Sequence, residues 1–280
     1  MDRHLFCFGY GYCAQAVVKH MAVSEKDWTF SGTKRNKIND QFAEVHQFDS
    51  MLALPKNITH ILVSIPPKED GDVALQRFAK HIAMLPKLQW VGYISSTGVY
   101  GDAKGEWVDE NSPIQPNNPF SKKRILAEHQ WQDFCGQHKI PLTIFRIAGI
   151  YGPGRSALDQ ILSDKAVVID KPNHVFSRIH IDDIAHIIHE AIEDYKNSEG
   201  IFNLADDSPS SAKDVIQHAC TLLNVAAPKP VSLDDANLSE MGKVFYSECK
   251  RVKNDKVKKH FNLKLKYPSF REGLMGIMNS

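Results

Sequence analysis

The sequence contains few cysteines, no excess of either charge and no long apolar run. Its five cysteines form no C-x-x-C pair, which argues against a disulfide framework and against a structural zinc site. Its 34 basic and 33 acidic side chains give a formal charge of +1, too little to attract nucleic acid or an anionic membrane. Residues 4–8 already read as a strand and leave no room for a signal peptide, so we expect a cytoplasmic protein without membrane contact.

Short β-rich segments alternate with helical segments through the first half of the chain. The 280 residues, 42% of them hydrophobic, are enough for one large core or for one core with a smaller lobe. Such alternation indicates βαβ units and a parallel sheet buried on both faces. The predicted strands are 4–8, 28–31, 45–48, 60–63, 90–95 and 142–146, and the predicted helices include 13–21, 74–83 and about 120–137.

After Gly154 the pattern changes to shorter helices and strands, with no internal repeat and no linker of low complexity. We therefore expect a dinucleotide-binding domain over residues 1–153 and a smaller lobe over residues 154–280 that is interleaved with it. In doubly wound α/β sheets, ligands bind outside the carboxyl ends of the strands. We expect the ligand of this chain to lie there, between the domain and the lobe.

A glycine turn of the form G-x-G-x-x-A follows the first predicted strand at residues 9–14. Glycine permits a tight turn and lets backbone N–H groups approach a pyrophosphate at the N-terminus of the next helix. The turn stands between a strand and a helix, as a dinucleotide site requires. A plain strand-to-helix turn is the alternative interpretation.

The end of the second predicted strand bears on which dinucleotide is bound. NAD-selective sites place Asp or Glu there for the adenosine ribose, whereas this chain has Thr33, Lys34 and Arg35. A hydroxyl and two cations suit a 2′-phosphate, which favours NADP over NAD. The alternative is that both cations are solvated loop charges.

Seven segments of the chain, in order, resemble the extended and atypical short-chain dehydrogenases, a family that includes nucleotide-sugar epimerases and dehydratases. The segments are GYGYCA, SSTGVYGD, the helix end RILAE, FRIAGIYGPGR, RIHIDDIA, FNLADDSP and KRVKNDKVK. The resemblance implies a doubly wound, Rossmann-like α/β fold with a smaller C-terminal α/β substrate lobe. It also implies an NADP-dependent oxidoreductase or epimerase-like enzyme for a small carbonyl or nucleotide-sugar-like substrate. The helix corresponding to 120–137 is a frequent dimer contact in this family, so a homodimer is one expected assembly.

In that family a Ser or Thr after the fifth strand orients the substrate oxygen, and a Tyr transfers the proton. A Lys four residues later lowers the pKa of the Tyr and holds the nicotinamide ribose. The matching positions here are Ser96, with Thr97 beside it, then Phe120 and Arg124. The chain has no tyrosine between residues 100 and 151, so no alignment restores the missing hydroxyl.

A phenyl ring has no exchangeable proton, so Phe120 cannot supply acid–base catalysis, which is typically worth ~10²–10⁴-fold. Arg124 can hydrogen-bond ribose hydroxyls as a fixed cation, but an arginine does not exchange its proton. Candidates for a substitute acid are Tyr100, Lys122, Lys123 and a water held by Ser96. The alternative function is a non-catalytic NADP(H)-binding sensor or scaffold.

The remaining candidates follow from the same segments. Arg178 is expected to clamp a phosphate or carboxylate of the substrate, and Asp183 to cap the helix after it. The candidate catalytic residues are Ser96, Thr97, Tyr100 and Arg124, and the candidate substrate-binding residues are Ser96 and Arg178. The candidate cofactor-binding residues are Gly9, Gly11, Tyr12, Cys13, Thr33, Arg35, Ser64, Pro66 and Arg124.

Two polar patterns are interpreted without a ligand. His186 and His189 share one helix face, but no third ligand stands in register, so we predict a solvated face and no metal site. The basic run 250–266 places Val252, Val257 and Phe261 on one helical face, which predicts a solvated amphipathic helix. The chain also lacks an aromatic stacking platform near that run, so we expect no nucleic-acid partner.

Overall fold

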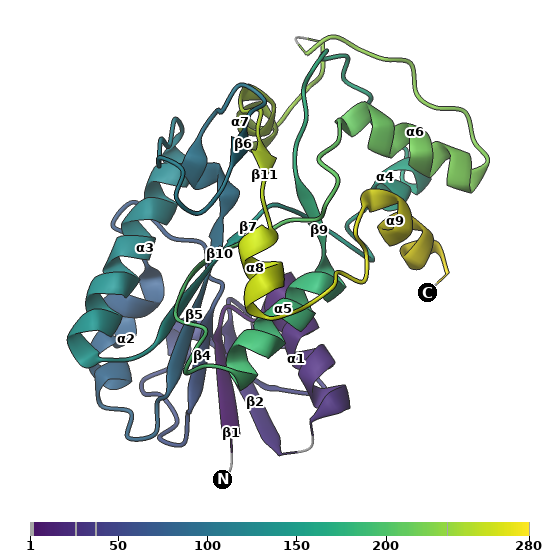
Figure 1. Cartoon of the computed structure of the whole chain (residues 1–280). Helices are drawn as coiled ribbons and strands as arrows, with labels where there is room; N and C mark the ends of the chain where they lie inside the picture. The colour runs from purple at the N-terminus through teal and green to yellow at the C-terminus, as the bar shows by residue number, and fades with distance from the viewer. Residues whose placement is uncertain (1–2, 26, 37, 234, 280) are drawn as a thin grey trace. The chain divides into compact units, whose positions relative to one another are not determined.

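The computed structural model describes residues 3–25, 27–36, 38–233 and 235–279 (Figure 1). The chain divides into two compact units, each assembled from three stretches of sequence. The first unit contains the residues up to 99 together with 119–146 and 184–202, and the second contains 100–118, 147–183 and the residues from 203 onward. The functional division expected at residue 153 stays a prediction.

A seven-stranded sheet in the order β10-β7-β5-β4-β1-β2-β3 dominates the first unit. β1 pairs in parallel with β2 on one side and with β4 on the other, so that Cys7 lies opposite Gly32 and Leu62. The strand order reverses between β1 and β4, which makes their carboxyl ends the expected ligand edge. The predicted Rossmann-like fold is confirmed. The strands are β1 (Arg3–Phe8), β2 (Trp28–Lys34), β3 (Glu44–Gln47), β4 (His60–Val63), β5 (Trp90–Ser96), β7 (Leu142–Ile147) and β10 (Gly200–Leu204).

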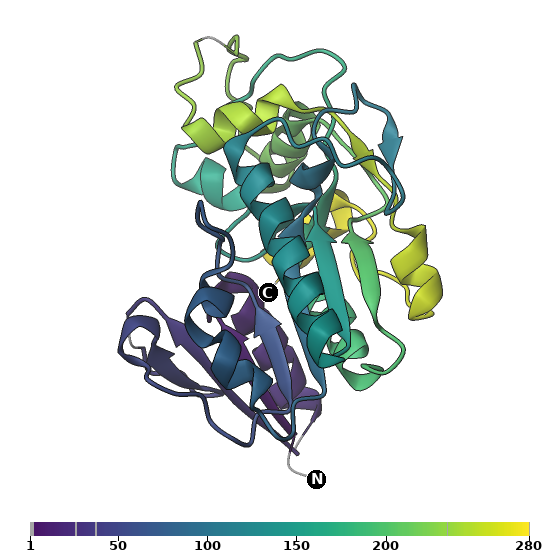
Figure 2. The ribbon, with the colours of Figure 1, turned by 90° about the vertical axis from the view of Figure 1, so that its left-hand side faces the viewer.

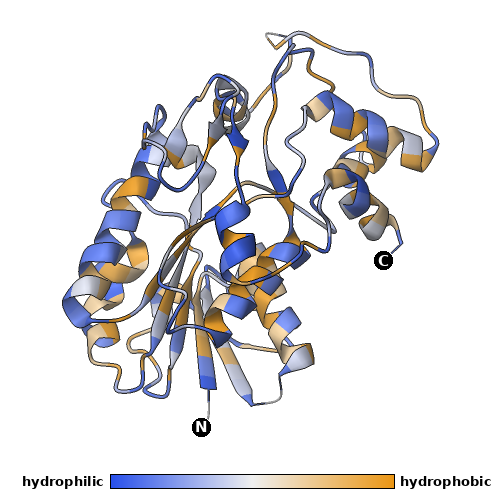
Figure 3. Cartoon of the chain, viewed as in Figure 1, coloured by the Kyte–Doolittle hydropathy of each residue, from blue (hydrophilic) through white to orange (hydrophobic). Residues whose placement is uncertain are grey.

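Helices cover both faces of this sheet. α2 (Val73–Ala83) and α3 (Pro119–His138) lie along one face, and α1 (Tyr12–Ser24) and α5 (Ile181–Glu193) lie along the other (Figures 1 and 2). Because both faces are covered, central strands such as β4 are buried at every position, and the covering helices carry hydrophobic and hydrophilic residues side by side (Figure 3). The core between the sheet and α2 and α3 includes Phe8, Ile61, Phe78, Val91 and Trp131.

The second unit is built from short elements around its own core. Three helices, α4 (Ala157–Leu162), α6 (Ala212–Leu223) and α9 (Phe270–Met278), bury residues such as Leu158, Ala219 and Leu274 against one another. The second unit also contains two pairs of short parallel strands. They are β8 (Gly149–Tyr151) with β9 (Arg178–His180), and β6 (Trp107–Val108) with β11 (Arg251–Val252).

Two local predictions were wrong. Asp183 does not cap α5, because the helix begins at Ile181; its carboxylate instead accepts the backbone N–H groups of Lys266 at 2.6 Å and Tyr267 at 3.1 Å. The basic run 250–266 is not one helix, since β11 pairing draws its first residues into a strand and only a short α8 (Asp255–His260) follows. α7 (Glu240–Ser247) precedes that strand. Among the described helices, none combines the length and apolar character needed to cross a bilayer.

Candidate functional site

The turn between β1 and α1 contains two glycines in different surroundings. Gly9 has a φ of +89°, in the left-handed region, and a Cβ there would lie 2.8 Å from Cγ1 of Ile65. Gly11 is the N-cap of α1, and a Cβ there would meet no described atom within 4 Å. The open space at Gly11 leaves the N-terminus of α1 accessible to the close approach of a ligand.

The start of α1 fits an anionic ligand in its electrostatics as well. Gly11 has no side chain that could cap the helix, and the first turn of α1 carries no acidic residue. The positive end of the helix dipole is therefore not neutralised by a local side chain. Tyr12 and Cys13 form that first turn, so the residues present fit a dinucleotide pyrophosphate.

Two hydroxyls from neighbouring strands hold the glycine turn. Thr33 of β2 is fully buried, and its Oγ1 accepts the Gly9 N–H at 3.2 Å. Ser64 follows β4 and donates its hydroxyl to the Gly9 carbonyl. Thr33 thus supports the turn from inside the protein, while Pro66 lies exposed just beyond the end of β4.

The residues after β2 present a cation and a hollow. Arg35 is exposed and makes no hydrogen bond or ion pair with any residue of the described ranges, so its guanidinium can meet an anion. A hollow of about 400 Å³ nearby is lined by Tyr10, Gln15, Lys19 and residues 39–42. Asp40 in that loop accepts the Tyr10 hydroxyl at 3.0 Å and the N–H groups at positions 42 and 43, all at Oδ1.

Arg124 ties the start of α3 to the end of β5. Its Nη1 donates to the Ile94 carbonyl at 2.9 Å and lies 3.4 Å from the Tyr93 hydroxyl. Because residues four apart share one helix face, Phe120 lies one turn earlier on the same side of α3. The Phe120 ring is 41% exposed. The Phe–Arg pair expected from the sequence therefore stands beside the carboxyl end of β5.

One turn further along α3, Glu128 makes a second polar connection to the sheet. Its carboxylate accepts the Ser95 hydroxyl of β5 and a bond from Arg146 of β7, where Nη2 and Oε2 are 2.7 Å apart. Both charged side chains are only 2% exposed. A charge pair this deeply buried is costly to break, so it fixes the position of α3 against β7, and the Ser95 bond adds a connection to β5.

Two serines flank the backbone of Gly98 at the end of β5. Ser96 is half-buried, and its Oγ accepts the Gly98 N–H at 3.1 Å. A Cβ built on Gly98 would lie 2.9 Å from Oγ of Ser121 and 3.4 Å from Oγ of Ser96. Sequence reasoning missed Ser121; its place directly after Phe120 was the available signal, but only the packing of α3 brings it beside Ser96. Thr97 is buried at the same strand end.

Two of the candidate substitute acids are engaged elsewhere. Tyr100 belongs to the second unit, where its hydroxyl is buried and donates to Oδ1 of Asn203 at 2.8 Å. Lys123 is ion-paired with Glu69. Lys122 is exposed on α3. Within the first unit, the structure therefore gathers Ser96, Thr97, Phe120, Ser121 and Arg124.

Arg178 lies in the second unit on β9. Its Nη1 donates to the Ser210 carbonyl at 2.9 Å and to the Phe176 carbonyl at 3.3 Å, and the guanidinium lies 4.9 Å from the centre of the Phe176 ring. Burial lowers the pKa of Arg178 to about 10, against the influence of Asp206. Burial raises the pKa of Asp206 to about 7, and its Oδ2 has no hydrogen-bond partner among the described residues. The sequence alone did not single out Asp206.

Comparison of the sequence with known proteins matches the model of the NAD dependent epimerase/dehydratase family over residues 33–205, more than half of the chain. Human dTDP-D-glucose 4,6-dehydratase is 35% identical over 95 residues. That match covers 34% of this chain and 22% of the human protein. The chain thus spans about a fifth of the length of this relative.

Three solved structures share the fold over nearly the whole chain. A conserved protein of unknown function from Silicibacter pomeroyi is 37% identical, with a TM-score of 0.89 over 99% of this chain and 98% of its own. MoeE5 with UDP-glucuronic acid and NAD has a TM-score of 0.80 at 16% identity, over 99% and 98% of the two chains. The human epimerase family protein SDR39U1 with NADPH has a TM-score of 0.78 at 17% identity, over 99% and 98%. The resemblance predicted from the seven segments is confirmed, and the chain belongs to the NAD dependent epimerase/dehydratase family.

Proposed function

We propose that this chain is an NADP-dependent oxidoreductase or epimerase-like enzyme that acts on a small carbonyl or nucleotide-sugar-like substrate. The observation that carries the proposal is the turn at Gly9 and Gly11, where one glycine is required by the backbone and the other leaves open space at a helix N-terminus. When bound, a nicotinamide dinucleotide supplies a hydride donor or acceptor. The relatives named above bind NAD in one case and NADPH in another, in agreement with either dinucleotide.

The preference for NADP rests on the end of β2. Arg35 is exposed there without an intramolecular partner in the described chain, and Lys34 is half-buried beside it. The acidic residue of the following loop, Asp40, is occupied by the Tyr10 hydroxyl and two backbone N–H groups. A 2′-phosphate would therefore meet a cation at the strand end, where Oδ1 of the loop carboxylate is already engaged.

The residues around β5 and α3 divide the remaining work. Arg124, held by the Ile94 carbonyl, is placed to donate to ribose hydroxyls. Ser96, half-buried at the end of β5, orients a substrate oxygen, and the buried Ser121 lies beside it. With Tyr100 and Lys123 engaged elsewhere, the proton donor is Lys122 or a water held by Ser96.

Arg178 is the proposed anchor for an anionic group of the substrate. Its guanidinium uses Nη1 for two carbonyls and rests on an aromatic ring, which leaves a planar, oriented cation for a phosphate or carboxylate. The structural neighbour MoeE5 was solved with UDP-glucuronic acid, whose diphosphate and carboxylate are anions of these kinds. The homodimer expected from the long helix remains part of this proposal.

Calorimetric titration with NADPH and, separately, NADH tests the cofactor. We expect micromolar NADPH affinity and at least tenfold weaker NADH affinity. Arg35→Gln should weaken NADPH binding about tenfold and leave NADH binding unchanged, because only NADPH carries the 2′-phosphate. Lys243→Gln, which removes an exposed lysine of the second unit, is the matched charge control and should change neither affinity. Failure to bind either dinucleotide would refute the proposal.

A second candidate, a sensor or scaffold that binds NADP(H) without turnover, is favoured by one observation. The Phe120 ring has no exchangeable proton, and two of its possible substitutes, Tyr100 and Lys123, already bond to other residues. Ser96→Ala separates the two functions. The enzyme predicts at least a tenfold loss of turnover on a panel of nucleotide sugars and small carbonyls with NADPH affinity unchanged. The sensor predicts no turnover by the parent on any member of the panel.

A further inference from the structure

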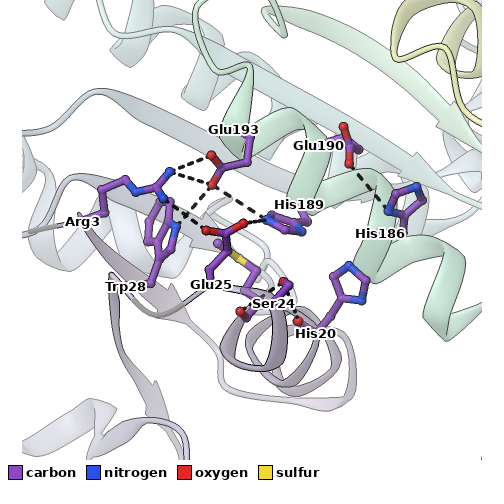
Figure 4. Close-up of polar contacts among 10 residues, drawn as sticks. Arg3, His20, Ser24, Glu25, Trp28, His186, His189, Glu190 and Glu193 are labelled. Carbon is purple, nitrogen blue, oxygen red and sulfur yellow. Dashed lines mark hydrogen bonds and ion pairs between the residues drawn. The ribbon is translucent and has the colours of Figure 1, made fainter.

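A second cluster of charged and imidazole side chains lies in the first unit, at the opposite edge of the sheet from the glycine turn (Figure 4). Glu25 directly follows α1, and Glu193 is the last residue of α5. His189 projects from α5 toward both carboxylates, and Arg3 and Trp28 begin the two strands beneath them. The cluster thus joins the ends of two helices at the amino-terminal edge of β1 and β2.

Both carboxylates stand where negative charge is unfavourable. The C-terminus of a helix carries the negative end of its dipole, and neither α1 nor α5 has a basic residue in its last turn. Arg3 supplies one cation: its Nη1 donates to the two Glu193 oxygens at 2.8 and 2.6 Å, and its Nη2 lies 3.5 Å from Glu25. One arginine against two carboxylates leaves the cluster with a net negative charge.

His189 has the properties of a ligand that lacks its ion. The residue is only 8% exposed, and its Nε2 has no hydrogen-bond partner in the described part of the chain. That nitrogen lies 3.9 Å from Oε1 of Glu25 and 3.8 Å from Oε1 of Glu193, too far for a hydrogen bond to either. Burial lowers the pKa of His189, against the pull of both carboxylates, which favours the neutral imidazole that binds metals. The solvated face predicted for His189 was therefore wrong.

We propose that Glu25, His189 and Glu193 bind a divalent transition-metal ion of the zinc class. The three ligand atoms lie within 4.8 Å of one another. Tetrahedral zinc with bonds of about 2.1 Å separates its ligand atoms by roughly 3.4 Å, so the observed spacings need a modest contraction. The two glutamates are about one-third exposed, at 33% and 36%, and can supply that movement.

The donor set selects the class of ion. One imidazole nitrogen with two carboxylate oxygens suits Zn²⁺, whereas Mg²⁺ and Ca²⁺ prefer oxygen ligands alone. The fourth position would be taken by water or by His20, whose ring centre lies 5.3 Å from that of His189. Such an ion would link the end of α1 to the end of α5, and its expected effect is on the stability of the first unit.

Zinc titration of the whole chain by calorimetry, with Co²⁺ absorption as the spectroscopic readout of geometry, tests the proposal. We expect one saturable site, a thermal unfolding midpoint that rises with zinc, and at least a tenfold loss of affinity in His189→Ala. His186→Ala is the matched control, since this 40%-exposed histidine lies on the same helix and should leave binding within twofold. Glu25→Gln, a conservative change at a partly exposed helix end, replaces His189→Ala if that variant does not fold.

Arg3 makes the test sharper, because it competes with an ion for the same carboxylates. Arg3→Gln should raise zinc affinity if the three residues form a metal site. Equal binding by the parent and His189→Ala, equal losses in His189→Ala and His186→Ala, or no saturable binding would overturn the proposal and leave an arginine-centred ion-pair cluster. NADPH affinity should be unchanged in all these variants, so this outcome is independent of the proposed function.

Discussion

Removing the charge of Glu128 should destabilise the first unit strongly. Glu128 and Arg146 are each 2% exposed, and two bonds, of 3.2 and 2.7 Å, join their charged groups. Glu128→Gln keeps the shape of the side chain but leaves the Arg146 cation buried without a counter-charge. Breaking a buried pair in this way costs about 3–5 kcal/mol. An exposed pair contributes no more than about 1 kcal/mol, so Glu240→Gln, which breaks the surface pair with Lys243, is the matched control.

Urea unfolding followed by tryptophan fluorescence is a suitable assay. Trp28, Trp90 and Trp131 are buried in the first unit, whereas Trp107 of the second unit is 50% exposed. The emission change therefore reports mainly on the first unit. The unfolding midpoint of Glu128→Gln should fall well below that of the parent, and that of Glu240→Gln should not move measurably.

A compensating variant separates the lost charge balance from lost packing. The triple change Ser95→Ala, Glu128→Leu and Arg146→Met removes these three bonded polar groups together and should recover at least half of the lost stability. A loss below about 1 kcal/mol in Glu128→Gln would refute the reasoning that a buried ion pair holds α3 against β7. Equal losses in the single and triple variants would show that packing, not charge, is responsible.

Further predictions concern the two glycines of the turn, Asp206 and Phe120. Gly11→Ala should fold normally and bind NADPH at least tenfold more weakly, as measured by calorimetry, and unchanged NADPH binding would contradict this prediction. Gly9→Ala should lower the thermal unfolding midpoint, because the φ of +89° at this position is strained for alanine. Asp206 has a folded-state pKa raised to about 7 from 3.8, so its contribution to stability is complete below pH 4 and is lost as the pH rises through 7. The free energy of unfolding of Asp206→Asn should therefore rise relative to that of the parent between pH 4 and 8, by up to about 4 kcal/mol. Unfolding titrations at each pH measure this difference, and a difference that does not vary with pH would contradict the prediction. Phe120→Tyr should create or increase turnover with NADPH in a substrate screen if the missing hydroxyl limits catalysis, and loss of an existing activity would assign Phe120 to a different mechanism.

The local sequence pattern was enough to predict the strands and the glycine turn and to show that the usual tyrosine is missing. The run at 60–63 coincides with β4, because a strand buried on both faces is mostly apolar, here at Ile61, Leu62 and Val63. Gly9 and Gly11 were recognisable because backbone conformation and ligand approach are local requirements. The phenylalanine at position 120 and the positive charge of Arg35 can both be read directly from the sequence.

Tertiary structure decided which side chains meet. Ser121 comes beside Ser96 only once α3 packs on β5, and Glu128 meets Arg146 only once α3 packs on β7. Asp183 binds the backbone at 266 and 267 instead of capping its helix, since a distant segment provides better-placed N–H groups. No sequence window contains such pairs, because strand order and helix packing, not periodicity, determine their contacts.

The cluster of Glu25 and His189 shows the same limit most clearly. Their side chains approach within 3.9 Å although 164 positions separate them in the chain, since α1 and α5 cover the same face of one sheet. Periodicity revealed that His186 and His189 share a helix face, but it could not show which one is buried or what lies opposite. Burial and charge environment are properties of the packed unit, and they turn an ordinary surface pattern into a candidate site.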